Sequence, residues 1–147
     1  MAAEKPSASH MDYALEDQVG HLLRRAHQRA TQIFLAEFAA SGLTPTQFAA
    51  LVRLFEHGTL SQNHLGRLTA MDPATIQGVI RRLSGRRLIE RVSNARDRRR
   101  AMLSLSAEGR ELIAGRFAAG LQVSRSTLAP LTAAERRVFV DLLRRLA

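Results

Sequence analysis

The chain contains no cysteine, and this absence excludes disulfide bonds, zinc sites built from thiolates and cysteine nucleophiles. No segment approaches the uninterrupted apolar length that a membrane span needs, and the first residues do not resemble a secretory signal. Lysine is nearly missing as well, since Lys5 is the only one. We therefore expect a soluble, cytoplasmic protein whose positive charge comes almost entirely from arginine.

The arginines make the chain strongly basic and are concentrated in one segment. The formal net charge of +9 and the pI of about 11.6 predict a polyanionic partner, either nucleic acid or an anionic membrane. Nine arginines lie between residues 81 and 100: Arg81, Arg82, Arg86, Arg87, Arg91, Arg96, Arg98, Arg99 and Arg100. Only Glu90 and Asp97 oppose them, which leaves this segment a net charge of +7. A genome that prefers arginine explains the residue type, but it does not explain the crowding.

The histidines and acidic residues form no recognisable catalytic or metal-binding motif. No HExxH or similar spacing occurs among the five histidines, and His21 and His27 lie six residues apart, which is not one face of a helix. No serine, histidine and aspartate set indicates nucleophilic catalysis. We therefore expect no metal, no cofactor, no catalytic residue and no enzymatic activity.

Apolar residues recur at helical spacing through most of the 147 residues, and the hydrophobic fraction of 46% suffices for a folded domain. The first eleven residues lack this pattern and are expected to form a flexible tail, in which Ser9-His10-Met11 is also consistent with a cloning scar. A long helix is predicted from Asp12 to about Gly42, where glycine suits a helix C-terminus.

Capping residues mark three further helix starts. Thr44-Pro45-Thr46-Gln47 supplies an N-cap, a first-turn proline and a capping-box glutamine. Ser61 suits the cap of a third helix, and Asp72-Pro73 begins a fourth. The apolar stripe of the fourth helix consists of Ile76, Val79, Ile80 and Leu83. Two short helices joined by a tight link predict a helix-turn-helix.

The segment after the helix-turn-helix is typical of a β-hairpin. Residues 88–93 and 101–105 have the composition of strands. The connecting residues, 94–100, are polar and too strongly charged to belong to a core. We interpret this hairpin as the wing of a winged helix-turn-helix.

Two amphipathic helices are predicted after the hairpin. The fifth helix begins at Ser106 and is expected to continue toward Leu128, and a capping box begins the last helix at Thr132. The helices at both ends of the chain carry more apolar surface than the central module needs, which favours a twofold dimer. The chain thus divides into a tail (1–11), an N-terminal dimerisation helix (12–43), the winged helix-turn-helix (44–105) and C-terminal dimerisation helices (106–147).

This mainly α-helical pattern with a small β-hairpin resembles the MarR (multiple antibiotic resistance regulator) family over about residues 12–146. The resemblance rests on Leu43-Thr44-Pro45-Thr46-Gln47-Phe48, on Asp72-Pro73-Ala74-Thr75, and most on Asp97-Arg98-Arg99 leading to Leu103-Ser104-Leu105-Ser106-Ala107-Glu108-Gly109-Arg110. It implies a triangular homodimer whose winged modules straddle adjacent major grooves of DNA. One departure is Arg87, which stands where the family usually has glycine, whereas Gly85 lies two residues earlier. The fourth helix is therefore expected to end slightly sooner.

The polar face of the fourth helix supplies the candidates for reading DNA bases: Ala74, Thr75, Gln77, Gly78, Arg81 and Arg82. A glutamine can bond adenine bidentately, an arginine can bond guanine, and Thr75 suits a thymine methyl group or a phosphate. The resemblance aligns Gln77, Gly78 and Arg82 with base-contacting positions. The alternative is an ordinary solvated helix face.

The wing and the third helix supply the remaining candidates for DNA contact. In the wing these are Arg96, Asp97, Arg98, Arg99 and Arg100. The resemblance implies that Asp97 orients Arg99 by a salt bridge while Arg96 or Arg98 enters the minor groove. The alternative is an undirected basic loop that touches phosphates only. Candidates for contact with the DNA backbone from the third helix are Ser61, Gln62, Asn63 and Arg67.

The resemblance also implies a small phenolic or aromatic carboxylate effector, bound between the dimer helices and the winged module. The candidate pocket residues are His21, Arg24, Arg25, His27, Phe48 and Arg53. The alternative is that Arg24 and Arg25 are solvated surface. The absence of cysteine excludes the thiol-oxidation sensing found in one branch of the family.

The leading hypothesis is a homodimeric repressor that binds inverted-repeat, double-stranded DNA and releases it when a small acid binds. Its half-sites are expected about 10 base pairs apart. The alternative is an architectural, nucleoid-type DNA-binding protein without a ligand. A third possibility is a protein-interaction module that reuses the winged fold.

Overall fold

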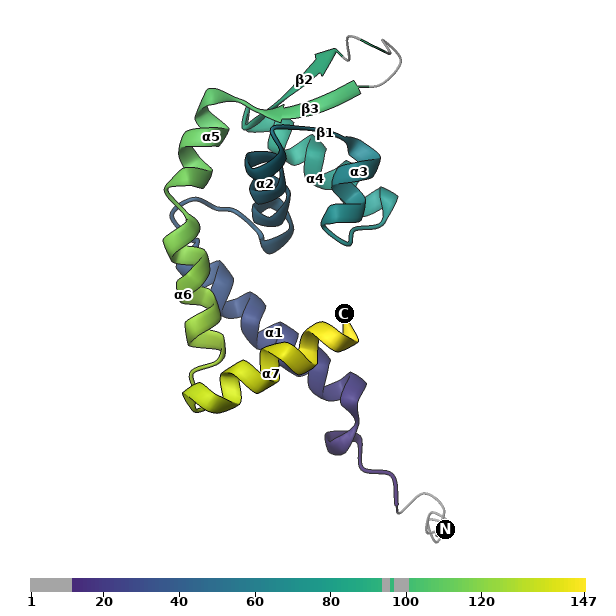
Figure 1. Cartoon of the computed structure of the whole chain (residues 1–147), viewed down its shortest axis with the longest axis vertical. Helices are drawn as coiled ribbons and strands as arrows, with labels where there is room; N and C mark the ends of the chain where they lie inside the picture. The colour runs from purple at the N-terminus through teal and green to yellow at the C-terminus, as the bar shows by residue number, and fades with distance from the viewer. Residues whose placement is uncertain (1–11, 94–95, 97–100) are drawn as a thin grey trace, which may run out of the picture.

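The computed structural model describes residues 12–93, 96 and 101–147, so the expected tail and most of the wing tip lie outside the described range. Figure 1 shows a compact winged module at one end and three longer helices at the other. The module contains α2 (Pro45–His57), β1 (Thr59–Ser61), α3 (Gln62–Leu68), α4 (Pro73–Gly85), β2 (Ile89–Ser93), β3 (Ala101–Leu105) and α5 (Ala107–Ala114). The longer helices are α1 (Val19–Glu37), α6 (Phe117–Thr127) and α7 (Ala133–Leu146).

Side-chain caps begin the helices where the sequence predicts them. Thr44 and Gln47 form a complete capping box at α2, and Asp72 caps α4 by accepting from the backbone N–H of Thr75. Ser61 caps α3 in the same way. A second capping box at Thr132 begins α7. Each cap satisfies N–H groups that have no partner within the helix, so the starts of these helices are fixed locally.

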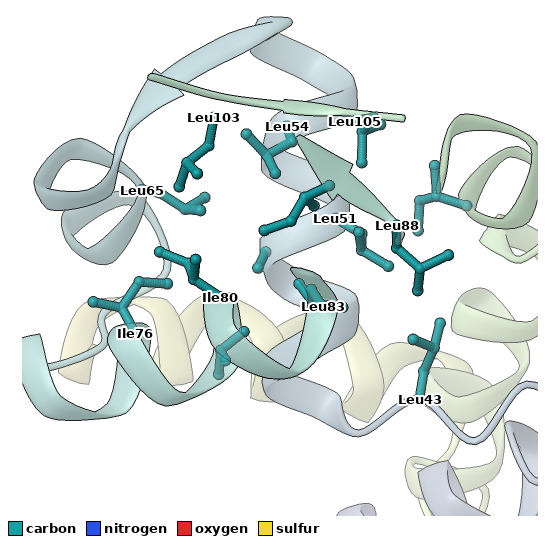
Figure 2. Packing of buried hydrophobic residues seen from close by; sticks show 14 of the residues in the cluster. Leu43, Leu51, Leu54, Leu65, Ile76, Ile80, Leu83, Leu88, Leu103 and Leu105 are labelled. Carbon is teal, nitrogen blue, oxygen red and sulfur yellow. The ribbon is translucent and has the colours of Figure 1, made fainter. Parts of the chain in front are cut away.

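The hydrophobic core lies inside the winged module (Figure 2). The predicted stripe of α4 is buried as expected, and Leu83 is fully enclosed. This stripe packs against α2, whose Leu51 and Leu54 are also fully buried. Because the apolar face of α4 is committed to this core, its opposite face is directed outward.

The small sheet has three strands, one more than the predicted hairpin. Its order is β1-β3-β2, and both pairings are antiparallel, with Ile89 opposite Leu105 and Thr59 opposite Ser104. Strand β1 is only three residues long and follows α2 directly after Gly58. A segment this short has too little alternation to be recognised, and its pairing with β3 is a long-range contact.

The first helix is shorter than predicted at both ends. It begins at Val19 because Gln18 has an extended backbone and a short 3₁₀ helix, Leu15–Asp17, precedes it. It ends at Glu37, and a series of turns then leads to Gly42, which has a φ of +65°. These turns bury both Phe38 and Leu43, each 1% exposed. Burial of these side chains therefore takes precedence over a longer helix.

The prediction of one helix from Ser106 toward Leu128 is wrong. The chain forms two helices, α5 and α6, with a break at Gly115 and Arg116. Glycine is a weak helix former, so a bend costs little there. The bend keeps Ile113 fully buried in the module core and turns α6 alongside α1.

The fourth helix ends at Gly85, as the departure from the family pattern predicts. Arg86 is its C-cap, and Arg87 follows with a φ of +57°, in the left-handed region that favours glycine. A residue with a Cβ atom pays about 1 kcal/mol there. Arg87 thus adopts the conformation for which glycine at this position would be suited.

Replacement of Arg87 by glycine is expected to raise the free energy of unfolding by about 1 kcal/mol, because it removes the left-handed strain. Urea denaturation measures the difference. The matched control is Arg91→Gly in strand β2, where glycine weakens the strand and is expected to lower stability. A destabilised Arg87→Gly variant would contradict this interpretation of the turn.

The three longer helices leave much of their apolar surface uncovered. Between them α1, α6 and α7 contain only one buried residue, Phe34. Their large exposed apolar side chains are Val19, Leu22, Leu23, Leu35, Leu121, Val138, Phe139, Leu142, Leu143 and Leu146. Within the described residues, no helix is both long enough and apolar enough to cross a membrane.

Candidate nucleic-acid interface

The outward face of α4 presents most of the predicted base-reading residues. Gln77, Arg81 and Arg82 are exposed, as are Ala74 and Thr75. Gly78 is half-buried, and the Arg82 guanidinium lies beside it: a Cβ atom at this glycine would be 3.5 Å from Nη1 of Arg82. The structure therefore brings an amide and two guanidinium groups together on one helix face, which is the chemistry that base edges require.

The first turn of α4 is held by Asp72. Its carboxylate accepts from the backbone N–H of Thr75 at 2.8 Å and from the Thr75 hydroxyl at 2.9 Å. The backbone hydrogen bond is the main reason that the pKa of Asp72 lies below its ordinary value of 3.8. This cap is therefore complete at neutral pH and is lost only as the pH falls below 3.8, through the lowered pKa.

The bond between Thr75 and Asp72 also narrows what Thr75 can do. Its hydroxyl hydrogen is donated to Asp72, so that hydrogen is not available for a phosphate oxygen. The methyl group remains on an exposed side chain. Of the two partners considered for this residue, the geometry favours the thymine methyl group.

The four predicted backbone-contacting residues lie together. Ser61, Gln62, Asn63 and Arg67 line one hollow of about 380 Å³, which Ala101 of β3 completes. A second hollow of about 310 Å³ shares Asn63 and Arg67 and continues along α3 to Pro73 at the start of α4. Polar donors thus border a continuous surface from the base of the wing to the recognition helix.

The wing is described only in part. Strands β2 and β3 form the predicted hairpin, and Arg91 and Arg96 are exposed. Asp97, Arg98, Arg99 and Arg100 lie outside the described residues, so the predicted salt bridge between Asp97 and Arg99 stays a prediction.

The six candidates for the effector pocket fall into separate places within the protomer. His21 and Arg24 are joined, with 3.1 Å between Nδ1 and Nη2, on the N-terminal half of α1. Arg25 and His27 are exposed on the same helix. Phe48 packs on the rings of Phe34 and Phe38, where α1 meets α2.

Arg53 lies elsewhere on α2 and is already engaged. Its Nε donates to the carbonyl of Leu68 at 3.3 Å, and its Nη1 forms a salt bridge of 2.8 Å with Glu56. It therefore joins α2 to the end of α3. Its chemistry as a cation was evident from the sequence, but its partners depend on how the two helices pack.

The described residues contain no cluster of three or more histidine, aspartate or glutamate side chains arranged to hold a metal ion. His57 and His64, which straddle a turn in sequence, have ring centroids 6.3 Å apart. They form a pair without a third ligand among the residues that the structure describes.

Sequence reasoning missed one feature of the recognition helix that depends on tertiary structure. Arg86 contributes to the basic segment, yet its Nη2 donates to the backbone carbonyl of Ser41 at 2.7 Å. Nothing in the local sequence links two residues 45 positions apart. Within the segment, this arginine differs from Arg81 and Arg82 because it is bonded to its own chain.

An outward-facing recognition helix, a preceding positioning helix and a β-hairpin define a winged helix-turn-helix DNA-binding protein. Comparison with known proteins agrees. Residues 41–100 match the model of the MarR family. The chain is 38% identical to the HTH-type transcriptional repressor NicR of Pseudomonas putida, over 96% of this chain and 91% of NicR.

Two solved structures are similar over nearly the whole chain. A probable transcriptional regulator from Pseudomonas aeruginosa is 49% identical, with a TM-score of 0.87, and covers 91% of this chain and 100% of its own. The regulator BpsR of Bordetella bronchiseptica, described as controlled in its DNA binding by 6-hydroxynicotinic acid, is 40% identical, with a TM-score of 0.86 and coverage of 91% and 96%. The chain belongs to the MarR family of DNA-binding transcriptional regulators, and is not an enzyme.

Proposed function

We propose that this protein is a homodimeric repressor that binds an inverted-repeat operator and releases it when a small aromatic acid binds. The observation that carries the proposal is the exposed face of α4, where Gln77, Arg81 and Arg82 lie together beside the hollow lined by α3. A single such face reads only a few base pairs. Two faces related by a twofold axis read an inverted repeat.

The uncovered apolar faces of α1, α6 and α7 support the dimer. Three helices of 19, 11 and 14 residues hold one buried residue between them, so their stripes contribute little to the fold of one protomer. Phe139 and Leu142 border an apolar groove of about 430 Å³ along α7. Contiguous apolar surface of this kind marks an interaction site.

Repression is supported by the similarity to NicR, which is named a transcriptional repressor. The half-sites are expected about 10 base pairs apart, centre to centre. The test is binding to the DNA upstream of the gene itself and of its neighbours, in competition with shuffled DNA. A nucleoid-type protein would bind both alike, and that outcome would favour the alternative function.

Replacement of Arg82 by alanine is expected to lower affinity for the cognate site about 10- to 100-fold, because one bidentate contact to a base is worth about 1–3 kcal/mol. Affinity for shuffled DNA is expected to change far less. Fluorescence anisotropy at fixed salt measures both. Arg125→Ala, an exposed arginine on α6, is the charge-matched control. Equal losses on the two DNAs would reject base reading by Arg82.

The aromatic-acid effector is proposed from two observations. His21 and Arg24 form a cationic pair on α1 that suits a carboxylate, and the Phe34, Phe38 and Phe48 rings lie at the contact between α1 and α2. The similarity to BpsR, whose DNA binding is described as regulated by 6-hydroxynicotinic acid, favours a heteroaromatic acid. Such a ligand must bind more tightly to the form that cannot bind the operator.

We expect 6-hydroxynicotinic acid to raise the melting temperature of the protein and to release the operator. Nicotinamide, which has a similar ring but no carboxylate, is the control. Arg24→Gln is expected to abolish the shift while leaving operator binding intact. If a panel of aromatic acids causes neither shift nor release, the effector proposal fails and the operator proposal stands.

A further inference from the structure

We propose that Arg86 is a positioning residue that sets the orientation of the recognition helix relative to the helices of the dimer. This inference rests on the proposed dimeric function. By charge and by place in the sequence, Arg86 would be counted with the arginines that contact phosphate. Its bond to Ser41 assigns it a different task.

The bond made by Arg86 joins the end of α4 to the segment that leaves α1. The acceptor is the backbone carbonyl of Ser41, at 2.7 Å from Nη2. Ser41 is itself buried and fixed, since its hydroxyl donates to the carbonyl of Phe38 at 2.9 Å. Phe38 is the C-cap of α1. Arg86 is therefore connected to the end of a proposed dimerisation helix through one rigid turn.

The next two residues hold the opposite side of the same helix end. The carbonyl of Arg87 accepts from the Ser106 hydroxyl at 2.7 Å, and the carbonyl of Leu88 accepts from the Ser106 backbone N–H at 3.0 Å. Ser106 is the N-cap of α5, which continues into α6. We call Ser41, Arg86, Arg87, Leu88 and Ser106 the junction.

The junction connects the recognition helix to both routes into the dimer. One route runs through Ser41 to α1, and the other runs through Ser106 to α5 and α6. A helix tied on one side only can pivot about that contact. Ties from two different segments fix its direction, and only the tie to α1 depends on a single side chain. Arg86 is thus the element whose loss frees this pivot without breaking the backbone contacts.

A positioning role has consequences that a phosphate contact does not. Loss of a phosphate contact removes one released counterion and lowers the slope of log affinity against log salt by about 0.9. Loss of a positioning contact leaves the number of phosphate contacts in the bound state unchanged. It instead lowers affinity because the two recognition helices of a dimer no longer hold a fixed separation.

The first measurement compares Arg86→Met with Arg81→Met, two identical substitutions on one helix. Methionine keeps an apolar stem and removes every donor. We expect Arg86→Met to lower cognate affinity about 10-fold with an unchanged salt slope. Arg81→Met is expected to lower the slope. Arg86→Lys, which keeps a donor for the Ser41 carbonyl, is expected to restore most of the affinity.

The second measurement reports geometry directly. Since the chain has no cysteine, Ser84→Cys on the exposed surface of α4 provides one labelling site per protomer. Pulsed electron paramagnetic resonance then gives the distribution of distances between the two recognition helices. Arg86→Met is expected to broaden this distribution, and Arg86→Lys to keep it narrow.

Either of two results overturns the proposal. A lowered salt slope with an unchanged distance distribution makes Arg86 a phosphate contact, and unchanged affinity and distances show that it positions nothing. Circular dichroism confirms that each variant is folded. Sedimentation of the unsubstituted protein separates this failure from failure of the proposed function, because a monomer would reject the dimeric repressor itself.

Discussion

Replacement of Gly109 by alanine is expected to lower the free energy of unfolding by about 3 kcal/mol or more. A Cβ atom at this position would lie 1.9 Å from the carbonyl oxygen of Leu88 and 2.9 Å from its carbonyl carbon. Both are backbone atoms, and the same carbonyl accepts from the Ser106 N–H. Neither side can move without breaking the contact between α5 and the end of α4. Chemical denaturation followed by circular dichroism measures the loss.

The matched control is Gly115→Ala at the other end of the same helix. There the nearest atoms to an added Cβ would be 3.7 Å away, and the backbone φ of −82° suits alanine. This variant is expected to be neutral or slightly stabilising. Equal stability of the two alanine variants would show that α5 does not pack on Leu88 as closely as described.

The close approach at Gly109 illustrates which features the sequence could not reveal. The Gly109 position was visible as part of the string after the wing, but its reason depends on a backbone carbonyl twenty-one residues earlier. The break at Gly115 and Arg116 is similar, because helical spacing continues through it and only tertiary packing bends the chain. Strand β1 was missed for the same reason: its pairing partner is β3.

Local chemistry, in contrast, predicted much of the winged module. The caps at Thr44, Asp72 and Thr132 bond within one turn of their own positions, so the sequence contains everything that determines them. The stripe of α4 follows from helical spacing, and it places Gln77 and Arg82 outward by elimination. The candidate interface was predictable because it is the complement of a predictable core.

Arg86 marks the limit of that reasoning at the interface. Charge counting treats each arginine of the basic segment alike, although Arg81 and Arg82 face outward while Arg86 bonds the Ser41 carbonyl. The effector candidates have the same limitation. Arg53 was grouped with Phe48 from its proximity in sequence, but it bonds Leu68 and Glu56 at the contact with α3. Composition gives the chemistry of a side chain, and packing decides its partner.

Replacement of Leu142 by glutamate is expected to convert the proposed dimer into a monomer. Leu142 is 49% exposed in the protomer and lies on the apolar side of α7, next to Val138 and Phe139. No residue of α7 is buried, so the substitution leaves the core of the winged module untouched. In a dimer it would bury an unpaired carboxylate, which costs several kcal/mol.

The consequence for DNA binding is expected to be large. A monomer loses the second half-site, and linking two binding modules raises affinity by about 10²- to 10⁴-fold. Leu142→Glu is therefore expected to lower operator affinity at least 100-fold, although every residue of its recognition helix is intact. Sedimentation velocity gives the mass and anisotropy gives the affinity. Leu142→Met, which keeps the volume and the apolar character, is expected to remain dimeric. A dimeric glutamate variant with full affinity would place the protomer contact away from this face of α7, and the separation of the two recognition helices would then be set by another surface.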